Sequence, residues 1–383
     1  MKILVASAFE AGSNFAHAIN TVKMAEGFAM LGHDVTLACR APLDGELEKE
    51  LLDYQYALHT PLRWVQLSPM RNGRVLNPDW DFARQLFLRL LFLRPDFVFT
   101  RNYILPWLSS FMGIPTAAES HAHPGTCTKP FNTFIKGASH RKFKALITIA
   151  PVLRDNFVAT GVPEEKILVL PDAVDLHIFS PPANLPASPF TGDKANVVYT
   201  GHLYDYKGIP LLLETARLAP DIQFHLIGGT VNDIGCTHEK ITSLGLSNVT
   251  VHGHKPRTDL PPYLWHADAL LLPPSLNHPS AQWTSPVKLG EYLASGRPVL
   301  ASDIPALRAW LTEEHVLFVE PDDAQAWSSA IKYALTHRDT TTQLTENGIK
   351  LATSWSYSQR AEHILNFCGK PAHSPRKESL TKL

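Results

Sequence analysis

The sequence predicts an α/β protein with two doubly wound parallel-sheet domains. Short runs rich in β-branched and aromatic residues alternate with longer helical runs along almost the whole chain, a pattern typical of parallel strands joined by crossover helices. So many parallel strands rarely form one open sheet, which favours two sheets. A chain of 383 residues is long enough for about two or three domains, so a second sheet has room to form.

The expected strands fall into two groups on either side of a proline-rich stretch. The first group comprises residues 3–8, 35–39, 65–68, 97–100, 116–119, 146–149 and 167–170. The second comprises residues 197–200, 224–227, 249–252, 270–272, 299–301 and 317–319. The stretch between them, residues 181–195, lacks helical periodicity and is predicted to be a linker. The two domains are therefore expected to span residues 1–180 and 196–353.

The end of the chain is expected to contain a helix and a tail. Residues 354–367 predict a C-terminal helix, which we expect to pack back on the first domain. Residues 368–383 predict a solvated tail.

Composition and charge exclude several classes of protein. Hydrophobic residues make up 45% of the chain and charged residues 19%, which is ordinary for a globular protein. With 35 basic and 36 acidic side chains, the chain has no excess of positive charge that would indicate binding to nucleic acid. The cysteines are far apart and form no CxxC pair, which indicates neither a disulfide framework nor a zinc site and favours a reducing cytoplasm. They are Cys39, Cys127, Cys236 and Cys368.

The most apolar helical stretch is too short to cross a membrane. A span needs about 20 apolar residues, whereas residues 84–96 are fewer and are interrupted by Arg89 and Arg94. We expect a helix buried against a sheet here, with docking on a membrane surface as the alternative. The first residues of the chain are better explained as a first strand than as a signal peptide.

A buried carboxylate is expected in residues 285–303, SPVKLGEYLASGRPVLASD. Ser285 is able to cap a helix, Pro286 suits its first position, and Gly296 suits its C-terminal turn. Inside so apolar a helix, Glu291 needs a hydrogen-bond donor or must reach water. A ligand is one such donor, and a salt bridge on the helix surface is the alternative.

A second stretch predicts an anion site. In VVYTGHLYDYKGIPLLLE, a strand ends at Thr200, Gly201 permits a tight approach, and Lys207 precedes a helix with Pro210 in its first turn. Free N–H groups at a helix start, the helix dipole and a lysine together favour phosphate. A solvated lysine at a turn is the alternative.

The chain resembles a family 4 glycosyltransferase of the GT-B fold, a family of retaining enzymes that move a sugar from a nucleotide-sugar to an acceptor. The resemblance runs through GHDVTLAC, GVPEEKILVLPDAVDLHIFSP, YTGHLYDYKG, HADALLLPP and SPVKLGEYLASGRPVLASD, in this order and over nearly the full length. It implies two Rossmann-like domains facing each other across a cleft. It also implies that catalysis needs no bound metal and no cofactor.

In the second domain the resemblance assigns roles to residues that match the family's motifs. Glu291 matches the second glutamate of the E-x7-E motif, which accepts hydrogen bonds from the ribose hydroxyls. Lys207 matches the lysine that binds the diphosphate. The backbone N–H groups at the helix start near Val287 and Lys288 are expected to bind the diphosphate as well. The backbone around Lys255 and Pro256 matches the segment that holds the nucleobase, and a plain surface turn is the alternative. Further expected substrate contacts are Gly201, Gly228, Thr284 and Ser285.

Two positions depart from the family's pattern. Trp283 stands where the first glutamate of E-x7-E would contact the donor sugar, so either its indole stacks on the sugar ring or activity is impaired. His202 stands where many relatives have an arginine on the diphosphate, and an imidazole is a weaker and pH-dependent substitute.

In the first domain the resemblance points to His121, Gly12 and Ser13. His121, in AAESHAHPG, matches the histidine beside the donor sugar and is expected to contact the sugar or relay a proton, with a structural role as the alternative. Gly12 and Ser13 follow the first strand and match the loop near the diphosphate and the acceptor.

Three short motifs imitate metal sites, and we expect none of them to bind a metal. The HxH pairs, His121 with His123 and His252 with His254, lack a third ligand in the sequence. Asp79 and Asp81, in DWD, precede a helix and are expected to be cap and first-turn acids.

The sequence thus predicts a retaining glycosyltransferase that uses a nucleotide-diphosphate sugar, with UDP- or GDP-sugar expected, and an unidentified acceptor. The resemblance implies a same-face mechanism in which the departing phosphate takes the acceptor proton. The alternatives are a GT-B sugar-nucleotide epimerase and a catalytically silent nucleotide-binding or scaffold protein. A peripheral membrane contact is a further expectation, and no nucleic-acid partner is expected.

Overall fold

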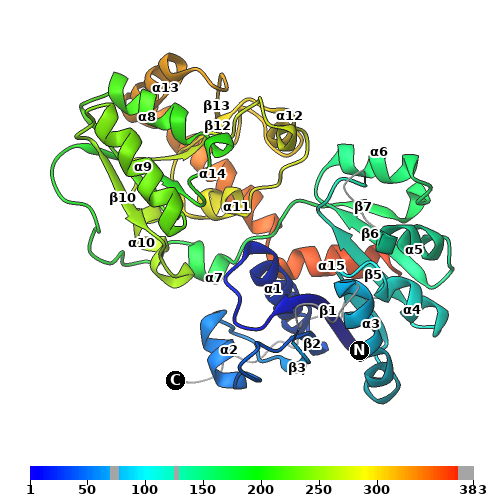
Figure 1. Cartoon of the computed structure of the whole chain (residues 1–383). Helices are drawn as coiled ribbons and strands as arrows, with labels where there is room; N and C mark the ends of the chain where they lie inside the picture. The colour runs from blue at the N-terminus through cyan, green and yellow to red at the C-terminus, as the bar shows by residue number, and fades with distance from the viewer. Residues whose placement is uncertain (70–76, 125–128, 370–383) are drawn as a thin grey trace, which may run out of the picture. The chain divides into compact units, whose positions relative to one another are not determined.

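The computed structural model describes residues 1–69, 77–124 and 129–369 (Figure 1). The chain forms two compact units: unit 1 is Met1–Ala173 with Ser356–Leu383, and unit 2 is Val174–Trp355. Cys127 and most of the predicted tail, residues 370–383, lie outside the described residues.

Unit 1 is built on a parallel sheet in which seven described strands take the order β3-β2-β1-β4-β5-β6-β7. The order reverses direction between β1 and β4, as in doubly wound sheets. The strands are β1 (Lys2–Glu10), β2 (Asp34–Arg40), β3 (Arg63–Leu67), β4 (Phe97–Thr100), β5 (Thr116–Ser120), β6 (Phe143–Thr148) and β7 (Ile167–Val169).

Helices of unit 1 cover this sheet. They are α1 (Ala16–Met30), α2 (Lys49–Gln55), α3 (Pro78–Leu93), α4 (Leu105–Phe111), α5 (Lys129–Ala138), α6 (Pro151–Ala159), the 3-10 turn η2 (Glu164–Lys166) and α15 (Tyr357–Phe367). The last helix lies beside the first (Figure 1). Gly27 makes this close packing possible, because a Cβ atom there would lie 2.5 Å from the carbonyl oxygen of Tyr357. The two helices share a core with β1 and β4 that includes Val22, Phe99 and Ile364.

Unit 2 repeats the architecture with a parallel sheet whose six described strands take the order β10-β9-β8-β11-β12-β13. The strands are β8 (Ala195–Thr200), β9 (Ile222–Ile227), β10 (Val249–Gly253), β11 (Ala269–Leu272), β12 (Val299–Ser302) and β13 (Leu317–Val319). The helices are α7 (Leu176–Phe179), α8 (Ile209–Leu218), α9 (Val231–Ser243), α10 (Pro261–Trp265), α11 (Val287–Ala294), α12 (Pro305–Arg308), α13 (Ala324–Thr336) and α14 (Arg338–Ser354). The 3-10 turns are η3 (Asp205–Lys207), η4 (Arg257–Asp259) and η5 (Pro279–Gln282).

Each strand predicted from the sequence is present, and the prediction of an α/β fold with two doubly wound sheets is confirmed. Apolar side chains on both faces of the central strands are buried, for example Val197 and Val198 in β8, which pack into two different cores. Parallel strands covered by helices on both faces give continuous apolar runs, and that pattern made them easy to recognise.

Helix ends were predicted less well. Pro286 does not occupy the first position of α11; it is the N-cap residue, with extended ψ of 116°, and no side chain caps the helix. The C-terminal helix begins at Tyr357 rather than at residue 354, because Ser354 still belongs to α14 and the hydroxyl of Ser356 accepts a hydrogen bond from the backbone N–H of Gln359. Asp79 and Asp81 are first-turn acids of α3, as predicted, and Asn77 is the cap.

Candidate active site

The candidate site in unit 2 lies at the carboxyl ends of β8 and β11. These two strands are neighbours in the sheet, and the strand order reverses between them. Doubly wound sheets bind ligands at this switch point. Gly208, with φ of +89°, brings the loop after β8 against the loop after β11, because a Cβ atom there would lie 1.9 Å from the carbonyl oxygen of Pro273.

Lys288 connects the first turn of α11 to the end of β8. Its Nζ donates a hydrogen bond to the carbonyl oxygen of Thr200 at 2.7 Å and lies 3.6 Å from the centroid of the Tyr199 ring. The Tyr292 hydroxyl, one turn further along α11, accepts a hydrogen bond from the backbone N–H of Thr200 at 2.7 Å. The loop that begins at Gly201 is therefore fixed by α11.

The site brings together the positive charges of Lys207 and Lys288. Both ammonium groups have lost water, and a bound anion would offset the free-energy cost of that loss. Burial, helped by the nearby Lys207, holds the pKa of the Lys288 ammonium well below its usual value, against the opposing influence of Glu291. Burial also lowers the pKa of Lys207, whose Nζ lies 5.1 Å from the centroid of the Tyr206 ring. Two ammonium groups that have lost water at the same end of a sheet gain the most interaction free energy from a bound anion such as phosphate.

Glu291 is buried, as the sequence predicted, and its protein partner is an arginine. The side chain is 9% exposed, and its Oε1 lies 3.1 Å from Nη1 of Arg257. Burial raises the pKa of the Glu291 carboxyl, Arg257 and Lys288 oppose the rise, and Asp175 adds to it. The predicted alternative of a helix-surface salt bridge does not describe this pair, since both partners are largely removed from water.

Arg257 is a functional candidate that the sequence reasoning missed. Its guanidinium lies 4.8 Å from the centroid of the Phe179 ring. Its Nε and Nη2 are buried and make no hydrogen bond with the residues that the structure describes. Buried donors of this kind normally have partners, so they are candidates to bind a ligand. Arg257 directly follows the predicted nucleobase segment, and that position was the available signal.

The other residues predicted for unit 2 occupy loops around this sheet end. Gly228 follows β9, and a Cβ atom there would lie 2.3 Å from the carbonyl oxygen of Gly201, so the two loops touch. Lys255 and Pro256 lie between β10 and η4, directly before Arg257. Trp283, Thr284 and Ser285 connect η5 to α11.

His202 is exposed and takes part in a stack of rings. Its imidazole lies parallel to the Tyr204 ring with centroids 4.9 Å apart, and its carbonyl oxygen accepts a hydrogen bond from the Tyr199 hydroxyl at 2.7 Å. The stack continues from Tyr204 to Tyr206 and then to His278.

In unit 1, His121 follows β5 and belongs to a buried charged cluster. Its Nε2 lies 2.7 Å from Oε1 of Glu119, and the other carboxylate oxygen lies 2.6 Å from Nη1 of Arg360 on α15. Burial disfavours the charge of Glu119, but Arg360, His121 and Arg101 outweigh burial and hold the pKa of its carboxyl well below its usual range. Glu119 is therefore an ionised acceptor.

This geometry fixes which nitrogen of the His121 ring donates a hydrogen bond and which one accepts. Because the Glu119 carboxylate only accepts hydrogen bonds, Nε2 of His121 must donate, and in the neutral imidazole Nδ1 is then left as the acceptor. Asp172 adds a second carboxylate 3.7 Å from the same Nε2, and Asn20 donates a hydrogen bond to Asp172 at 2.9 Å. Glu119, Asp172 and Arg360 were not among the predicted site residues.

Gly12 and Ser13 lie in the loop after β1, at the switch point of the first sheet. The carbonyl oxygen of Gly12 accepts a hydrogen bond from Gln55, and that of Ser13 accepts one from the Tyr56 hydroxyl at 3.0 Å. These contacts order the loop through its backbone.

One histidine of each HxH pair has a protein partner, Glu119 for His121 and His225 for His252. His252 is hydrogen-bonded to His225 at 2.9 Å, and burial, with the help of His252, lowers the pKa of His225 to about 4. Over residues 1–69, 77–124 and 129–369, no cluster of three or more His, Cys, Asp or Glu side chains is placed to hold a metal ion.

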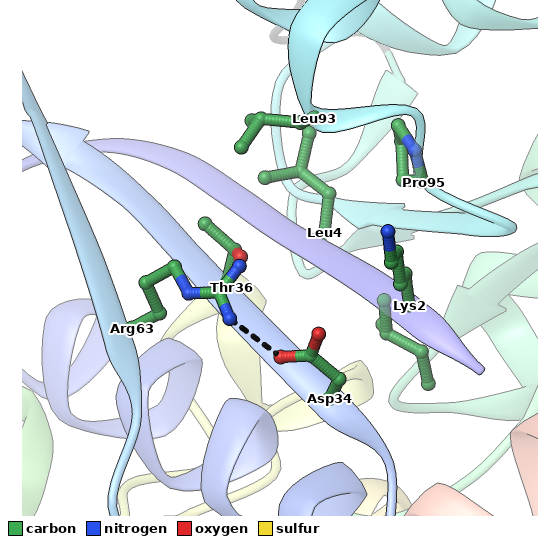
Figure 2. Close-up of a pocket in the computed structure, with 8 residues that line it drawn as sticks. Lys2, Leu4, Asp34, Thr36, Arg63, Leu93 and Pro95 are labelled. Atoms are coloured by element: carbon green, nitrogen blue, oxygen red, sulfur yellow. Dashed lines mark hydrogen bonds and ion pairs between the residues drawn. The ribbon is translucent and has the colours of Figure 1, made fainter.

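A small pocket lies at the opposite end of the first sheet (Figure 2). It is lined by the amino-terminal parts of β1, β2 and β3, and the ion pair between Arg63 and Asp34, 3.3 Å apart, stands at its edge (Figure 2). Parallel sheets bind their ligands at the carboxyl ends of the strands. This pocket is therefore not the candidate site.

Comparisons with known proteins agree with this architecture. The model of the family described as Glycosyltransferase Family 4 matches residues 19–178, and that described as Glycosyl transferases group 1 matches residues 194–337. No curated protein matches the sequence.

Solved structures with the same fold include glycosyltransferases. Anabaena HepE in complex with UDP and glucose aligns with a TM-score of 0.72 at 14% identity, over 96% of this chain and 99% of that one. The sucrose-phosphate synthase of Thermosynechococcus elongatus gives 0.71 at 18% identity, over 96% and 98%. WaaG, a glycosyltransferase involved in lipopolysaccharide biosynthesis, gives 0.67 at 15% identity, over 94% and 99%. With its two doubly wound units and these family matches, the chain belongs to glycosyltransferase family 4 and is a glycosyltransferase of the GT-B fold.

Proposed function

We propose that this enzyme is a retaining glycosyltransferase whose unit 2 binds a nucleotide-diphosphate sugar, with a UDP-sugar as the first candidate. The observation that carries the proposal is the convergence of Lys207, Lys288 and the Glu291–Arg257 pair at the switch point of the second sheet. HepE, which shares the fold, was crystallised with UDP and with UDP-glucose, and this supports UDP as the first nucleotide to test.

In this proposal each charged group has a distinct role. The diphosphate contacts Lys207, Lys288 and the first N–H groups of α11, which replace the water that burial has removed from the two ammonium groups. The ribose hydroxyls donate to Glu291, and Arg257 holds that carboxylate in place. Trp283 is proposed to stack on the donor sugar in place of the family's glutamate.

His121 is proposed to accept a hydrogen bond from the sugar or to relay a proton through Nδ1. In the same-face mechanism, the bond between C1 of the sugar and the phosphate oxygen breaks while the acceptor oxygen bonds to C1 on the same face. The acceptor proton moves to the departing phosphate. Fixed cations stabilise the charge that develops on this phosphate, each by roughly 3–4 kcal/mol when well placed.

The acceptor is proposed to be a glycan, a lipid or a small molecule. We place the enzyme in the cytoplasm, and the free thiols of Cys39 and Cys236 support this placement. Peripheral contact with a membrane is part of the same proposal. No helix among the described residues is long and apolar enough to cross a bilayer.

Thermal unfolding with UDP, GDP and ADP tests the nucleotide site. At 100 times its dissociation constant, the preferred nucleotide is expected to stabilise the wild type by about 2.7 kcal/mol. Lys207→Ala and Glu291→Ala are expected to lose this shift, while Lys350→Ala and Glu239→Ala, at exposed positions of unit 2, keep it. A shift that survives in the first two variants, or no shift with any nucleotide, contradicts the proposal.

Turnover separates the transferase from its alternatives. A transferase is expected to release nucleoside diphosphate only when an acceptor is added. An epimerase would convert the nucleotide-sugar without an acceptor, and a silent binding protein would do neither. Nucleotide release measured with and without a panel of acceptors distinguishes the three.

Nucleotide affinity is expected to begin to fall at a pH below the usual lysine pKa of about 10.4. The pKa values of Lys207 and Lys288 are lowered in the free protein, so these groups lose their protons at lower pH than an ordinary lysine, and binding a diphosphate requires the protonated forms. Titration calorimetry in two buffers of different ionisation enthalpy should show proton uptake on binding in this range. Affinity that stays constant up to pH about 10 would contradict the assignment.

A further inference from the structure

The loop that carries Lys207 is joined to the loop after β11 by stacked rings. His202, Tyr204 and Tyr206 follow β8, whereas His278 belongs to the loop after β11. The Tyr206 and His278 rings are nearly parallel, with centroids 4.2 Å apart, and the Tyr204 and Tyr206 centroids are 5.5 Å apart. The rings therefore connect the two loops that meet at the switch point of the second sheet.

Backbone contacts join the same two loops on either side of Lys207. The backbone N–H of Ser275 donates a hydrogen bond to the carbonyl oxygen of Tyr206 at 3.0 Å. Gly208 packs against the carbonyl oxygen of Pro273. Lys207 lies between Tyr206 and Gly208 in the chain, so its position depends on where the loop after β11 lies.

The loop after β11 is itself held by Asp322, which lies between β13 and α13. The Oδ2 atom of Asp322 accepts three hydrogen bonds. They come from the Ser275 hydroxyl at 3.1 Å, the backbone N–H of Leu276 at 3.0 Å and the side-chain amide of Asn277 at 3.1 Å. Hydrogen bonds to a carboxylate are stronger than those between neutral groups. One carboxylate oxygen thus fixes three consecutive residues of the loop.

Asp322 makes these contacts from a backbone conformation that costs free energy. Its φ is 59°, in the left-handed region that a Cβ atom disfavours and that glycine adopts without this cost. Residues held in such conformations occur often at functional sites. A glycine here would lack the carboxylate, and the contacts of that carboxylate with the loop are what the conformation makes possible.

The neighbouring Asp323 shows what an ordinary structural acid does in the same turn. Its side chain accepts hydrogen bonds from the backbone N–H groups of Gln325 and Ala326 and so caps α13. In the part of the chain that the structure describes, the side-chain hydrogen bonds of Asp322 all go to the loop after β11. Asp322 therefore serves that loop, and Asp323 serves the helix.

We propose that Asp322 is a positioning residue for the nucleotide diphosphate: it fixes the loop after β11, and that loop sets the position of Lys207 through Tyr206. Asp322 touches no reacting atom and acts only through this loop. The inference rests on the proposed function, in which Lys207 contacts the diphosphate.

Two variants of Asp322 separate its carboxylate from its backbone conformation. Asp322→Gly suits the left-handed backbone but removes the acceptor, whereas Asp322→Asn also tolerates this backbone and keeps an oxygen acceptor. Glu320→Ala removes an exposed carboxylate from the same turn and is the matched control. Because Asp322→Gly relieves strain while it loses exposed hydrogen bonds, its melting temperature is expected to stay within about 3 °C of the wild-type value.

Titration calorimetry with UDP, or with GDP or ADP where one of these stabilises the wild type instead, measures the effect on binding. Asp322→Gly is expected to bind about fivefold more weakly, as if the loop held Lys207 in its binding position about one-fifth of the time. Asp322→Asn and Glu320→Ala are expected to bind within about twofold of the wild type. Rescue by asparagine would show that the acceptor oxygen is what matters.

Hydrogen exchange without nucleotide tests the coupling between the loops directly. In Asp322→Gly, the backbone amides of residues 206–208 and 275–277 are expected to exchange faster than in the wild type, because both loops open more often. Residues 253–258, which follow β10, should exchange at the wild-type rate. Asp322→Asn should match the wild type in all three segments.

Three outcomes would overturn the proposal. Asp322→Gly keeps wild-type affinity, or its residues 206–208 exchange as they do in the wild type. In the third, its melting temperature falls by more than about 10 °C, which would assign Asp322 a role in the stability of unit 2 as a whole. A wild type that binds no nucleotide would instead defeat the proposed function, and exchange in the free protein would still decide whether Asp322 holds the Lys207 loop.

Discussion

Replacing Glu119 with alanine is expected to lower the free energy of unfolding by about 3–5 kcal/mol, the largest effect on stability that we predict. Glu119 is 3% exposed, and its carboxylate sits between Arg360 and His121. Removing it leaves the buried guanidinium of Arg360 without its charge partner, and a buried unpaired charge costs far more than a surface ion pair contributes. Urea denaturation measures the change.

A second variant separates the charge effect from loss of packing. Glu119→Ala with Arg360→Met removes both charges, so it should be less destabilised than the sum of the two single variants. Glu165→Ala, at an exposed position of unit 1, is the control and should lie within about 0.5 kcal/mol of the wild type. A Glu119→Ala protein as stable as this control would show that the cluster does not hold unit 1 together.

The pH dependence of the same variants has a defined sign. The folded-state pKa of Glu119 is lowered below its unfolded value of about 4.3, so its contribution to stability is complete above that pH and is lost as pH falls through and below it. Wild-type stability should therefore decline below about pH 4.3 more steeply than that of the double variant.

Replacing Lys288 with alanine is expected to weaken nucleoside diphosphate binding by at least about 30-fold. Its ammonium group is held between the Thr200 carbonyl and the Tyr199 ring, at the end of the strand where the diphosphate is proposed to bind. The same change should alter stability by no more than about 1 kcal/mol, because the lost hydrogen bond is offset by removal of a poorly solvated charge.

Affinity and stability must therefore be measured on the same protein. Titration calorimetry gives the affinity, thermal unfolding without nucleotide gives the stability, and Lys350→Ala is the matched control. Wild-type affinity in Lys288→Ala would remove this lysine from the site. A loss of affinity that accompanies a large loss of stability would instead indicate a structural role.

The strands could be predicted because each one depends on a short local pattern in the sequence. A parallel strand buried on both faces is a short apolar run, and Gly201 follows such a run directly, with Lys207 at the end of the next turn. The burial of Glu291 could also be predicted, since residues 289–294 around it are apolar or small.

The partners of the charged residues could not be predicted in the same way. Glu291 is paired with Arg257, and Glu119 with Arg360, 241 residues away along the chain. Such pairs form only because the fold brings distant segments of the chain together. No local pattern in the sequence can therefore predict them. Helix ends were also misjudged, as with Pro286, because a proline suits both the N-cap and the first turn.

Hydrogen exchange of the wild type with saturating UDP and, in parallel, GDP and ADP tests the central claim most directly, because it locates the nucleotide without mutation. We predict that at least one nucleotide slows exchange of the backbone amides in residues 200–208, 253–258 and 286–292, which surround the carboxyl ends of β8 and β11. Protection confined to other segments, such as those lining the pocket of Figure 2, would contradict the account, as would no protection with any of the three nucleotides.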